Sequence, residues 1–528
     1  MKNGLLIYLF TLLPLSASAQ DMQMRRGNCL PDSETGVAAA RGQVVRRLPA
    51  INKQWDSTRV YRQLVILVSF SDTDFSMENP QEIYQRMFNE QGYNQKLGAG
   101  SVADYFRSQS GGFLNLEFDV YGPYKVSTKA QPIENPTADT KNYGTSVLRE
   151  ATQLFLAEHA DIDFSPYDWN NNGTVNQVIY VYAGYTGNQN STKSFGHIWP
   201  NTSSFSSITT NSGQKISNYS ASAELWTNNV LCGIGTVCHE FSHSLGLPDI
   251  YPTSNSAWTY SVVDEWDLMD GGNFTNYGWC PPNYTALERH LMGWLDYDEL
   301  TQPTTVTDLK PISEGGKAYV VKHTENEYLL LENRQWRGWD AGLPGKGLVA
   351  YHVNYIESKW KGNTPNNTSG KPNFHLMNND SFSYEDWTSY LIDQGVTSQS
   401  AIYQNANRMN SQYFMHACFP FGDDDAKMDS LTDQSVPSTL MYNTNADNSQ
   451  YLSKPITNIK VSDDGLVSFN FMGGTPTGIT AAKPTANSNP AAAVFDLNGR
   501  RVSQHQTGQK GIRLVRLADG SVRKVIGN

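Results

Sequence analysis

The sequence predicts an α+β protein, and three features of the 528-residue chain support this class. Strand and helix patterns alternate between residues 64 and 183, a helical pattern around residue 240 contains metal-binding residue types, and residues 304–472 contain short strand patterns separated by turns. With 39% hydrophobic and 12% aromatic residues, the chain can form a large core and more than one domain. Its net charge of −11 argues against a nucleic-acid partner.

Composition and pattern divide the chain into six expected parts. These are a signal peptide (residues 1–19), a pro-segment (20–56), a domain with a mixed sheet (57–300), a β-rich region (301–472), a linker (473–490) and a small β unit (491–528). In the mixed domain, apolar periodicity predicts strands at 64–70, 113–120 and 175–183, and helices at 79–89, 101–109 and 143–158. A further helix is expected at 286–295.

The N-terminus predicts export. Lys2 precedes an apolar stretch from Leu5 to Leu15, and the small residues 17–19 form a cleavage pattern before Gln20, as in a secretory signal peptide. This stretch is too short for an anchor, and no later apolar run is long enough for a transmembrane segment. We therefore expect a secreted protein, extracellular or at the cell surface.

The expected pro-segment is basic and contains one cysteine. Its five arginines offer sites for processing: Arg25, Arg26, Arg41, Arg46 and Arg47. Cys29 is a candidate latency thiolate, because a soft thiolate competes well with water for zinc and would keep a proenzyme inactive. The alternative is an unpaired cysteine without this role.

The turn before the third expected strand contains a candidate calcium loop. Asp168, Asn170 and Asn172 place oxygen atoms at positions 1, 3 and 5, and Gly173 occupies position 6. Position 12 is Ile179 instead of Glu, so a calcium ion would be bound weakly or would need further ligands. The alternative is an Asn-rich turn without an ion.

The helical pattern around residue 240 contains the most informative motif. His239 and His243 are four residues apart, so their imidazoles lie on one face of a helix and can bind one metal ion. Glu240 would accept a proton from metal-bound water. Gly246 lets the helix end and the chain turn, which would bring Asp249 toward the metal. Three ligands and a water are the coordination of a catalytic zinc; the alternative is a buried helix with incidental histidines.

A second motif follows this helix. Met269 lies in an acidic, Gly-rich turn at residues 266–272, and metzincin peptidases have a methionine turn beneath the metal ligands at the corresponding point. The alternative is a methionine of the ordinary core. The order of the two motifs favours the Met-turn.

These residues resemble those of the immune inhibitor A-like secreted zinc metallopeptidases, whose pattern is HExxHxxGxxD. The resemblance extends over roughly residues 60–472. Further similar segments are residues 64–72, 101–106, 110–112, 327–335, 343–348 and 352–353. The family resemblance implies a metzincin-like zinc peptidase domain with a mixed sheet, an active-site helix and a Met-turn. It also implies protein or peptide substrates.

We expect a zinc-dependent endopeptidase in which zinc-bound water attacks the peptide carbonyl and Glu240 acts as general base. One alternative is a secreted adhesion or binding protein on a peptidase-like scaffold, which would not need Glu240 and both histidines. The other is a zinc hydrolase of a different bond, such as a carboxypeptidase or an amidase.

The composition changes at residue 473. Gly, Pro, Thr and Asn are frequent in residues 473–490, which predicts a linker. Residues 491–528 form the expected β unit, which resembles C-terminal sorting or attachment domains of secreted bacterial proteins. This resemblance implies export machinery as a partner.

Overall fold

The structure is a computed structural model of the chain. It describes residues 55–95, 98–130, 140–187, 197–226, 228–253, 262–368, 370–378, 417–422, 427–474, 491–495, 501–502, 511–517 and 522–527. The expected signal peptide, nearly all of the expected pro-segment and its Cys29 lie outside these residues.

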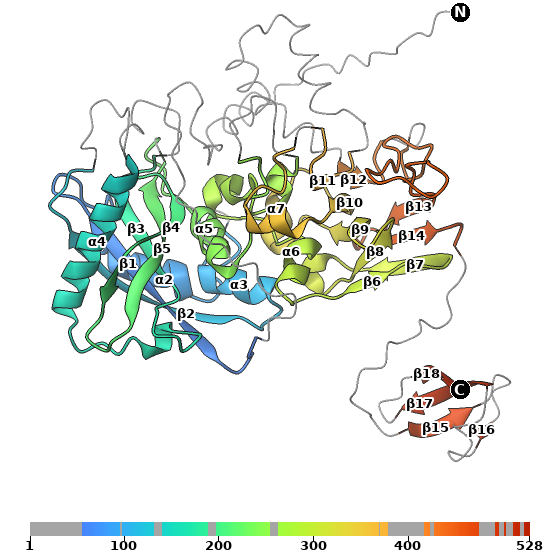
Figure 1. Cartoon of the computed structure of the whole chain (residues 1–528), viewed down its shortest axis with the longest axis horizontal. Coiled ribbons are helices and arrows are strands. Elements are labelled where there is room, and N and C mark those ends of the chain that lie inside the picture. Colours follow the sequence, from blue (N-terminus) through green and yellow to red (C-terminus); the bar gives the residue numbers. More distant parts are fainter. Residues whose placement is uncertain are drawn as a thin grey trace, which may run out of the picture.

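A five-stranded sheet with the strand order β2-β1-β3-β5-β4 organises the first half of the described chain (Figure 1). Its strands are β1 (Val60–Ser69), β2 (Asn115–Lys125), β3 (Val178–Tyr185), β4 (Asn201–Thr209) and β5 (Lys215–Leu225). All neighbours pair in parallel except the edge strand β4, which is antiparallel to β5. The sequence predicts β1, β2 and β3; β4 and β5 were missed because Ser, Thr and Asn, which favour turns, are frequent in both.

Helices cover both faces of this sheet. They are α2 (Pro80–Asn89), α3 (Val102–Gln109), α4 (Thr140–Glu158) and α5 (Gly235–Leu245), which confirms the four helices predicted in this half. Side chains of β1 alternate between the faces. Leu64 and Ile66 pack in a cluster with Phe155 of α4, whereas Val65 packs in another cluster with Phe241 of α5. The sheet therefore supports α5 from one side.

The second half of the body is β-rich, as the sequence predicts. A six-stranded sheet has the order β11-β10-β9-β8-β6, with β12 also paired to β10, and a three-stranded sheet has the order β13-β14-β7. The strands are β6 (Tyr297–Glu299), β7 (Thr304–Leu309), β8 (Ala318–Lys322), β9 (Glu327–Arg334), β10 (Gly347–Asn354), β11 (Phe374–Leu376), β12 (Cys418–Phe419), β13 (Ile456–Val461) and β14 (Val467–Phe471).

Two short helices lie between the sheets. They are α6 (Ala286–Leu291) and α7 (Glu357–Lys361). Helix α6 ends earlier than the predicted residue 295, and Gly293, with a φ of 74°, has a left-handed backbone that does not continue a helix. Figure 1 shows α5, α6 and α7 between the five-stranded and six-stranded sheets.

One hydrophobic cluster includes residues from both halves. Phe241 of α5 and Leu287 of α6 share it with Leu330 of β9, Tyr351 of β10 and Trp360 of α7. Burial of large apolar side chains is the main stabilising contribution to a fold, so the β-rich half helps to hold α5 in place.

The C-terminal residues form a separate hydrogen-bonded sheet with the order β16-β15-β17-β18. Its strands are β15 (Ala491–Phe495), β16 (Arg501–Val502), β17 (Gly511–Leu517) and β18 (Val522–Gly527). The export role expected for this unit stays a prediction. Within the described part of the chain, no helix has both the length and the apolarity required to cross a membrane.

A fully buried arginine connects β9 to the loop before α6. Arg334 donates two hydrogen bonds to Asp340, at 2.9 and 2.7 Å, and one to Glu332 at 2.9 Å. The same carboxylates accept backbone N–H groups, Asp340 from Asn283 and Glu332 from Ala286. This ionic network fixes the start of α6 against the six-stranded sheet.

Arg334→Met should lower the free energy of unfolding by about 3–5 kcal/mol, because two buried carboxylates would lose their counter-ion. Chemical denaturation measures this change. Arg86→Met is the matched control: Arg86 is half-exposed and pairs with Glu90 one helical turn away, so its loss should lower the free energy of unfolding far less. Equal effects of the two substitutions would contradict the role given to the buried network.

Candidate metal centre

Helix α5 ends in a way that brings the chain back toward its own histidines. Gly246 has a φ of 115°, a left-handed conformation that glycine adopts without strain. Its N–H donates to the carbonyl of His243, and the N–H of Leu247 donates to the carbonyl of Ser242, the two hydrogen bonds of a Schellman motif. The helix therefore ends at Leu245, two residues after His243, and Asp249 follows three residues after Gly246.

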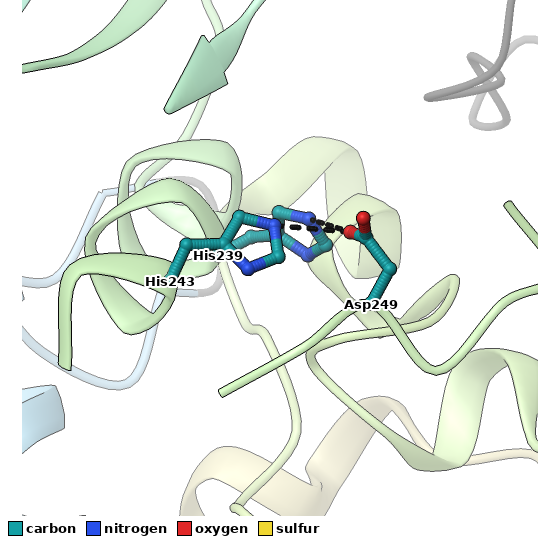
Figure 2. A group of neighbouring side chains, drawn as sticks. All are labelled: His239, His243 and Asp249. Atoms are coloured by element: carbon teal, nitrogen blue, oxygen red, sulfur yellow. Dashed lines mark ion pairs between the residues drawn. The ribbon is translucent and has the colours of Figure 1, made fainter. Parts of the chain in front are cut away.

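The structure brings together the three residues predicted as metal ligands. Nε2 of His239 and Nε2 of His243 lie 3.3 and 3.0 Å from Oδ1 of Asp249 (Figure 2). All three side chains are buried, and their ligand atoms lie within 4.8 Å of one another. Among the described residues, this is the only group of three or more His, Cys, Asp or Glu side chains that converges in this way.

Backbone carbonyls determine which nitrogen of each histidine faces this point. Nδ1 of His239 lies 2.8 Å from the carbonyl oxygen of Leu268, and Nδ1 of His243 lies 2.8 Å from that of Leu247. A carbonyl oxygen only accepts, so Nδ1 has to carry the proton in both rings. In the neutral imidazole, Nε2 then presents a lone pair, which is the arrangement of metal-binding histidines.

The site favours positive charge. Two Nε2 lone pairs and a carboxylate oxygen face one another, and Nε2 of His239 is buried without a hydrogen-bond partner in the described structure. Burial lowers the pKa of His239, but the carboxylates of Asp249 and Glu240 raise it by more, so the net shift is upward. A cation among these atoms would satisfy all three, and a donor set of two imidazoles and a carboxylate suits zinc.

Glu240 is held by the edge strand of the first sheet. The hydroxyl of Thr202 on β4 lies 2.6 Å from the backbone oxygen of Glu240 and 2.8 Å from its Oε2, so its single proton is shared between these two acceptors. Because Glu240 follows His239 directly, it points about 100° away from that histidine around the helix axis. The expected general base is thus positioned by a strand that the sequence did not predict.

Met269 is fully buried and belongs to the same hydrophobic cluster as α5. The residue before it, Leu268, supplies the carbonyl that orients His239, and the carbonyl of Met269 accepts the N–H of Ile250. The turn therefore touches the histidine helix and the segment after Asp249. This geometry fits the expected Met-turn, whose assignment stays a prediction.

Two buried carboxyl groups lie beside this turn. Asp267 accepts the N–H of Met269 at 2.6 Å, and Glu288 of α6 accepts the N–H of Thr285 at 2.7 Å. Burial raises the pKa of Glu288 to about 7 and that of Asp267 well above its usual range. Burial therefore favours the neutral form of both carboxyl groups over the charged form.

Asn363 contacts the third ligand and was not predicted from the sequence. It follows α7, and its side-chain amide donates to Oδ2 of Asp249 at 2.6 Å. The sequence contains no spacing that relates it to the motif, because 114 positions separate it from Asp249.

The predicted calcium loop is a turn held by hydrogen bonds of Asp168. The Asp168 carboxylate accepts the backbone N–H groups of Asn172 and Gly173, at 3.0 and 2.7 Å, which is the geometry of the Asn-rich turn. The calcium site at Asp168, Asn170 and Asn172 stays a prediction.

The four cysteines of the described chain, Cys232, Cys238, Cys280 and Cys418, are buried thiols that form no disulfide.

Comparisons with known proteins relate part of the chain to metallopeptidases. Residues 52–291 match the family model described as the immune inhibitor A peptidase M6 catalytic domain, which confirms the family resemblance for this part of the chain. The pre-pro-metalloprotease PrtV of Vibrio cholerae serotype O1 is similar in two strains, M66-2 and ATCC 39315 (El Tor Inaba N16961). Each is 22% identical, and the match covers 46% of this chain but only 31% of the relative.

Zinc should stabilise the apo protein against unfolding, and Asp249→Ala should remove most of this effect. At a zinc concentration about 1,000 times the dissociation constant, a ligand that binds only the folded state adds about 4 kcal/mol. Thermal unfolding with and without zinc measures this stabilisation. Asp161→Ala is the control, because Asp161 is exposed. Full zinc-dependent stabilisation of Asp249→Ala would mean that the third ligand lies elsewhere.

Proposed function

We propose that this chain, whose residues 52–291 match the immune inhibitor A peptidase M6 catalytic domain, is a secreted zinc metalloendopeptidase. The observation that supports this most directly is the convergence of His239, His243 and Asp249 within 4.8 Å, next to a buried Glu240. These are the residue types and the arrangement that a hydrolytic zinc site requires.

His239, His243 and Asp249 would hold the zinc ion. When bound, zinc supplies the positive charge that polarises a peptide carbonyl and lowers the pKa of water to about 7. The carbonyls of Leu268 and Leu247 keep both imidazoles in the orientation that binding needs.

Glu240 would move the proton. Its carboxylate would accept the proton of the attacking water and pass it to the nitrogen of the leaving amine. The hydroxyl of Thr202 holds Oε2 from one side and so limits the rotation of the carboxylate. A fixed base near the reacting atoms contributes typically about 10²- to 10⁴-fold to the rate.

The edge position of β4 supports internal cleavage of an extended peptide. Among the described strands, β4 pairs with β5 alone, so a peptide could form strand hydrogen bonds along its other side near Thr202, away from Ser206, whose backbone oxygen accepts a hydrogen bond from Arg149. Thr202 connects this strand to Glu240. A peptide bound along β4 would extend on both sides of the base, which suits an endopeptidase better than an enzyme for chain ends.

Secretion rests on the N-terminal sequence. Residues 1–19 have the pattern of a signal peptide, and residues 20–56 are the proposed pro-segment, with Cys29 as the candidate latency thiolate. The name of the relative from Vibrio cholerae describes a precursor with pre- and pro-parts, as proposed for this chain.

Glu240→Gln should retain zinc and lower kcat/KM on casein by at least about 100-fold, because the amide does not accept the proton. Glu82→Gln, on the exposed side of α2, is the control and should leave activity unchanged. Zinc content and internal cleavage of casein are measured on protein lacking residues 1–19, and again after removal of the segment through Arg47, so that latency is separated from inactivity.

An active Glu240→Gln variant would contradict the role of Glu240. No cleavage by the wild-type protein in either form would favour the adhesion or binding alternative. Release of terminal residues only would favour a carboxypeptidase.

Thr202→Val should keep zinc and lower kcat/KM by about 10-fold or more, since a hydrogen bond to a charged group contributes about 1.5–3 kcal/mol. Thr209→Val is the matched control on the same strand, where the side chain is exposed. If the two variants have the same activity, Thr202 does not position the base.

A further inference from the structure

We infer that Asn363, from the loop after α7, is a positioning residue for the third metal ligand, and that the β-rich half therefore completes the metal site. This inference rests on the proposed function and adds a residue to it. Asn363 lies outside the span 52–291 that matches the peptidase catalytic domain. The metal-binding unit would accordingly extend beyond the matched domain.

Two hydrogen bonds of opposite direction join Asn363 and Asp249. The N–H of Asp249 donates to Oδ1 of Asn363 at 2.6 Å, and Nδ2 of Asn363 donates to Oδ2 of Asp249 at 2.6 Å. One amide thus contacts both the backbone and the side chain of the ligand residue. Because Oδ2 is held in this way, Oδ1 is the oxygen that faces both histidines, 3.0 Å from His243 and 3.3 Å from His239.

The backbone at this position suits asparagine. Asn363 has a φ of 58°, in the left-handed region that most side chains avoid and that asparagine tolerates. Only an amide of this length at this position supplies one acceptor and one donor to the same residue. Asp would place a second carboxylate against Oδ2, and Gly would keep the backbone while removing both hydrogen bonds.

The contact belongs to a longer docking segment, which we define as residues 363–367. Asn367 accepts the N–H of Thr253 at 2.7 Å, and Asn366 donates to the carbonyl of Ile250 at 2.9 Å. The carbonyl of Asn363 itself accepts the hydroxyl of Thr253 at 2.7 Å. The docking segment therefore lies along residues 249–253, the stretch that starts with the ligand.

The docking segment is anchored at both ends in the described core. Trp360 of α7 is 1% exposed and belongs to the same hydrophobic cluster as Phe241 of α5. On the other side, Asn366 exchanges two hydrogen bonds with the backbone of Phe374 on β11, a fully buried residue. Because the docking segment is anchored in this way, the amide of Asn363 has a fixed position and can orient the carboxylate of Asp249.

Zinc binding and the Asn363 contact should therefore be coupled. A partner that orients a metal ligand typically changes metal affinity by about 10- to 100-fold. Coupling of this kind is reciprocal, so the orienting contact strengthens zinc binding as much as zinc strengthens the contact.

The test is the zinc dissociation constant of the full chain lacking residues 1–19, measured by competition with a chromophoric chelator. Asn363→Gly should bind zinc about 10- to 100-fold more weakly than wild type. Asn367→Ala, which loses a contact in the same docking segment but none to Asp249, should stay within about threefold. Asn79→Gly controls for the substitution itself, since Asn79 is an exposed asparagine with a φ of 54° and no side-chain cap.

Thermal unfolding of the zinc-free proteins accompanies these titrations. An unchanged midpoint for Asn363→Gly, together with weaker zinc binding, would establish a positioning role and not a general loss of stability. Wild-type affinity of Asn363→Gly would overturn the inference, and so would equal weakening by Asn367→Ala, which would point to docking alone. Absence of zinc binding by the wild type would overturn the proposed metal site as well, so the two failures are distinguishable.

Discussion

Two imidazole nitrogens and one carboxylate oxygen meet inside the protein with their lone pairs facing one another, and the rest of the site depends on this constraint. In a medium of low polarity, such an arrangement is stable only if a positive charge compensates it. Carbonyl oxygens of Leu268 and Leu247 keep each imidazole turned toward the shared point.

Each group at this point is held by a different part of the chain. The turn containing Met269 orients His239, the end of α5 orients His243, and the docking segment contacts Asp249. These parts keep their relative positions because a single hydrophobic cluster connects α5, α6, β9, β10 and α7. The buried Arg334 network adds an ionic connection between β9 and the start of α6. The proposed metal centre is therefore held by residues from both halves of the body.

The proposed metal ligands and the proposed general base lie on different sides of helix α5. Both histidines face Asp249, and His239 also contacts the carbonyl of Leu268, whereas Glu240 contacts Thr202 of β4. Neighbouring positions on a helix point about 100° apart, so adjacent residues can serve different functions without competing for one partner.

The sequence by itself determined the α+β class, most helices, three of the five strands in the first sheet, and the residues that converge at the site. These features are local: helical spacing relates His239 to His243, and Gly246 allows the turn that returns Asp249. Only the tertiary structure decided which residues support them. Thr202 lies on a polar edge strand without a strand pattern, and Asn363 lies 114 positions from its partner. Such partners meet through packing of distant segments, and no local periodicity records that packing.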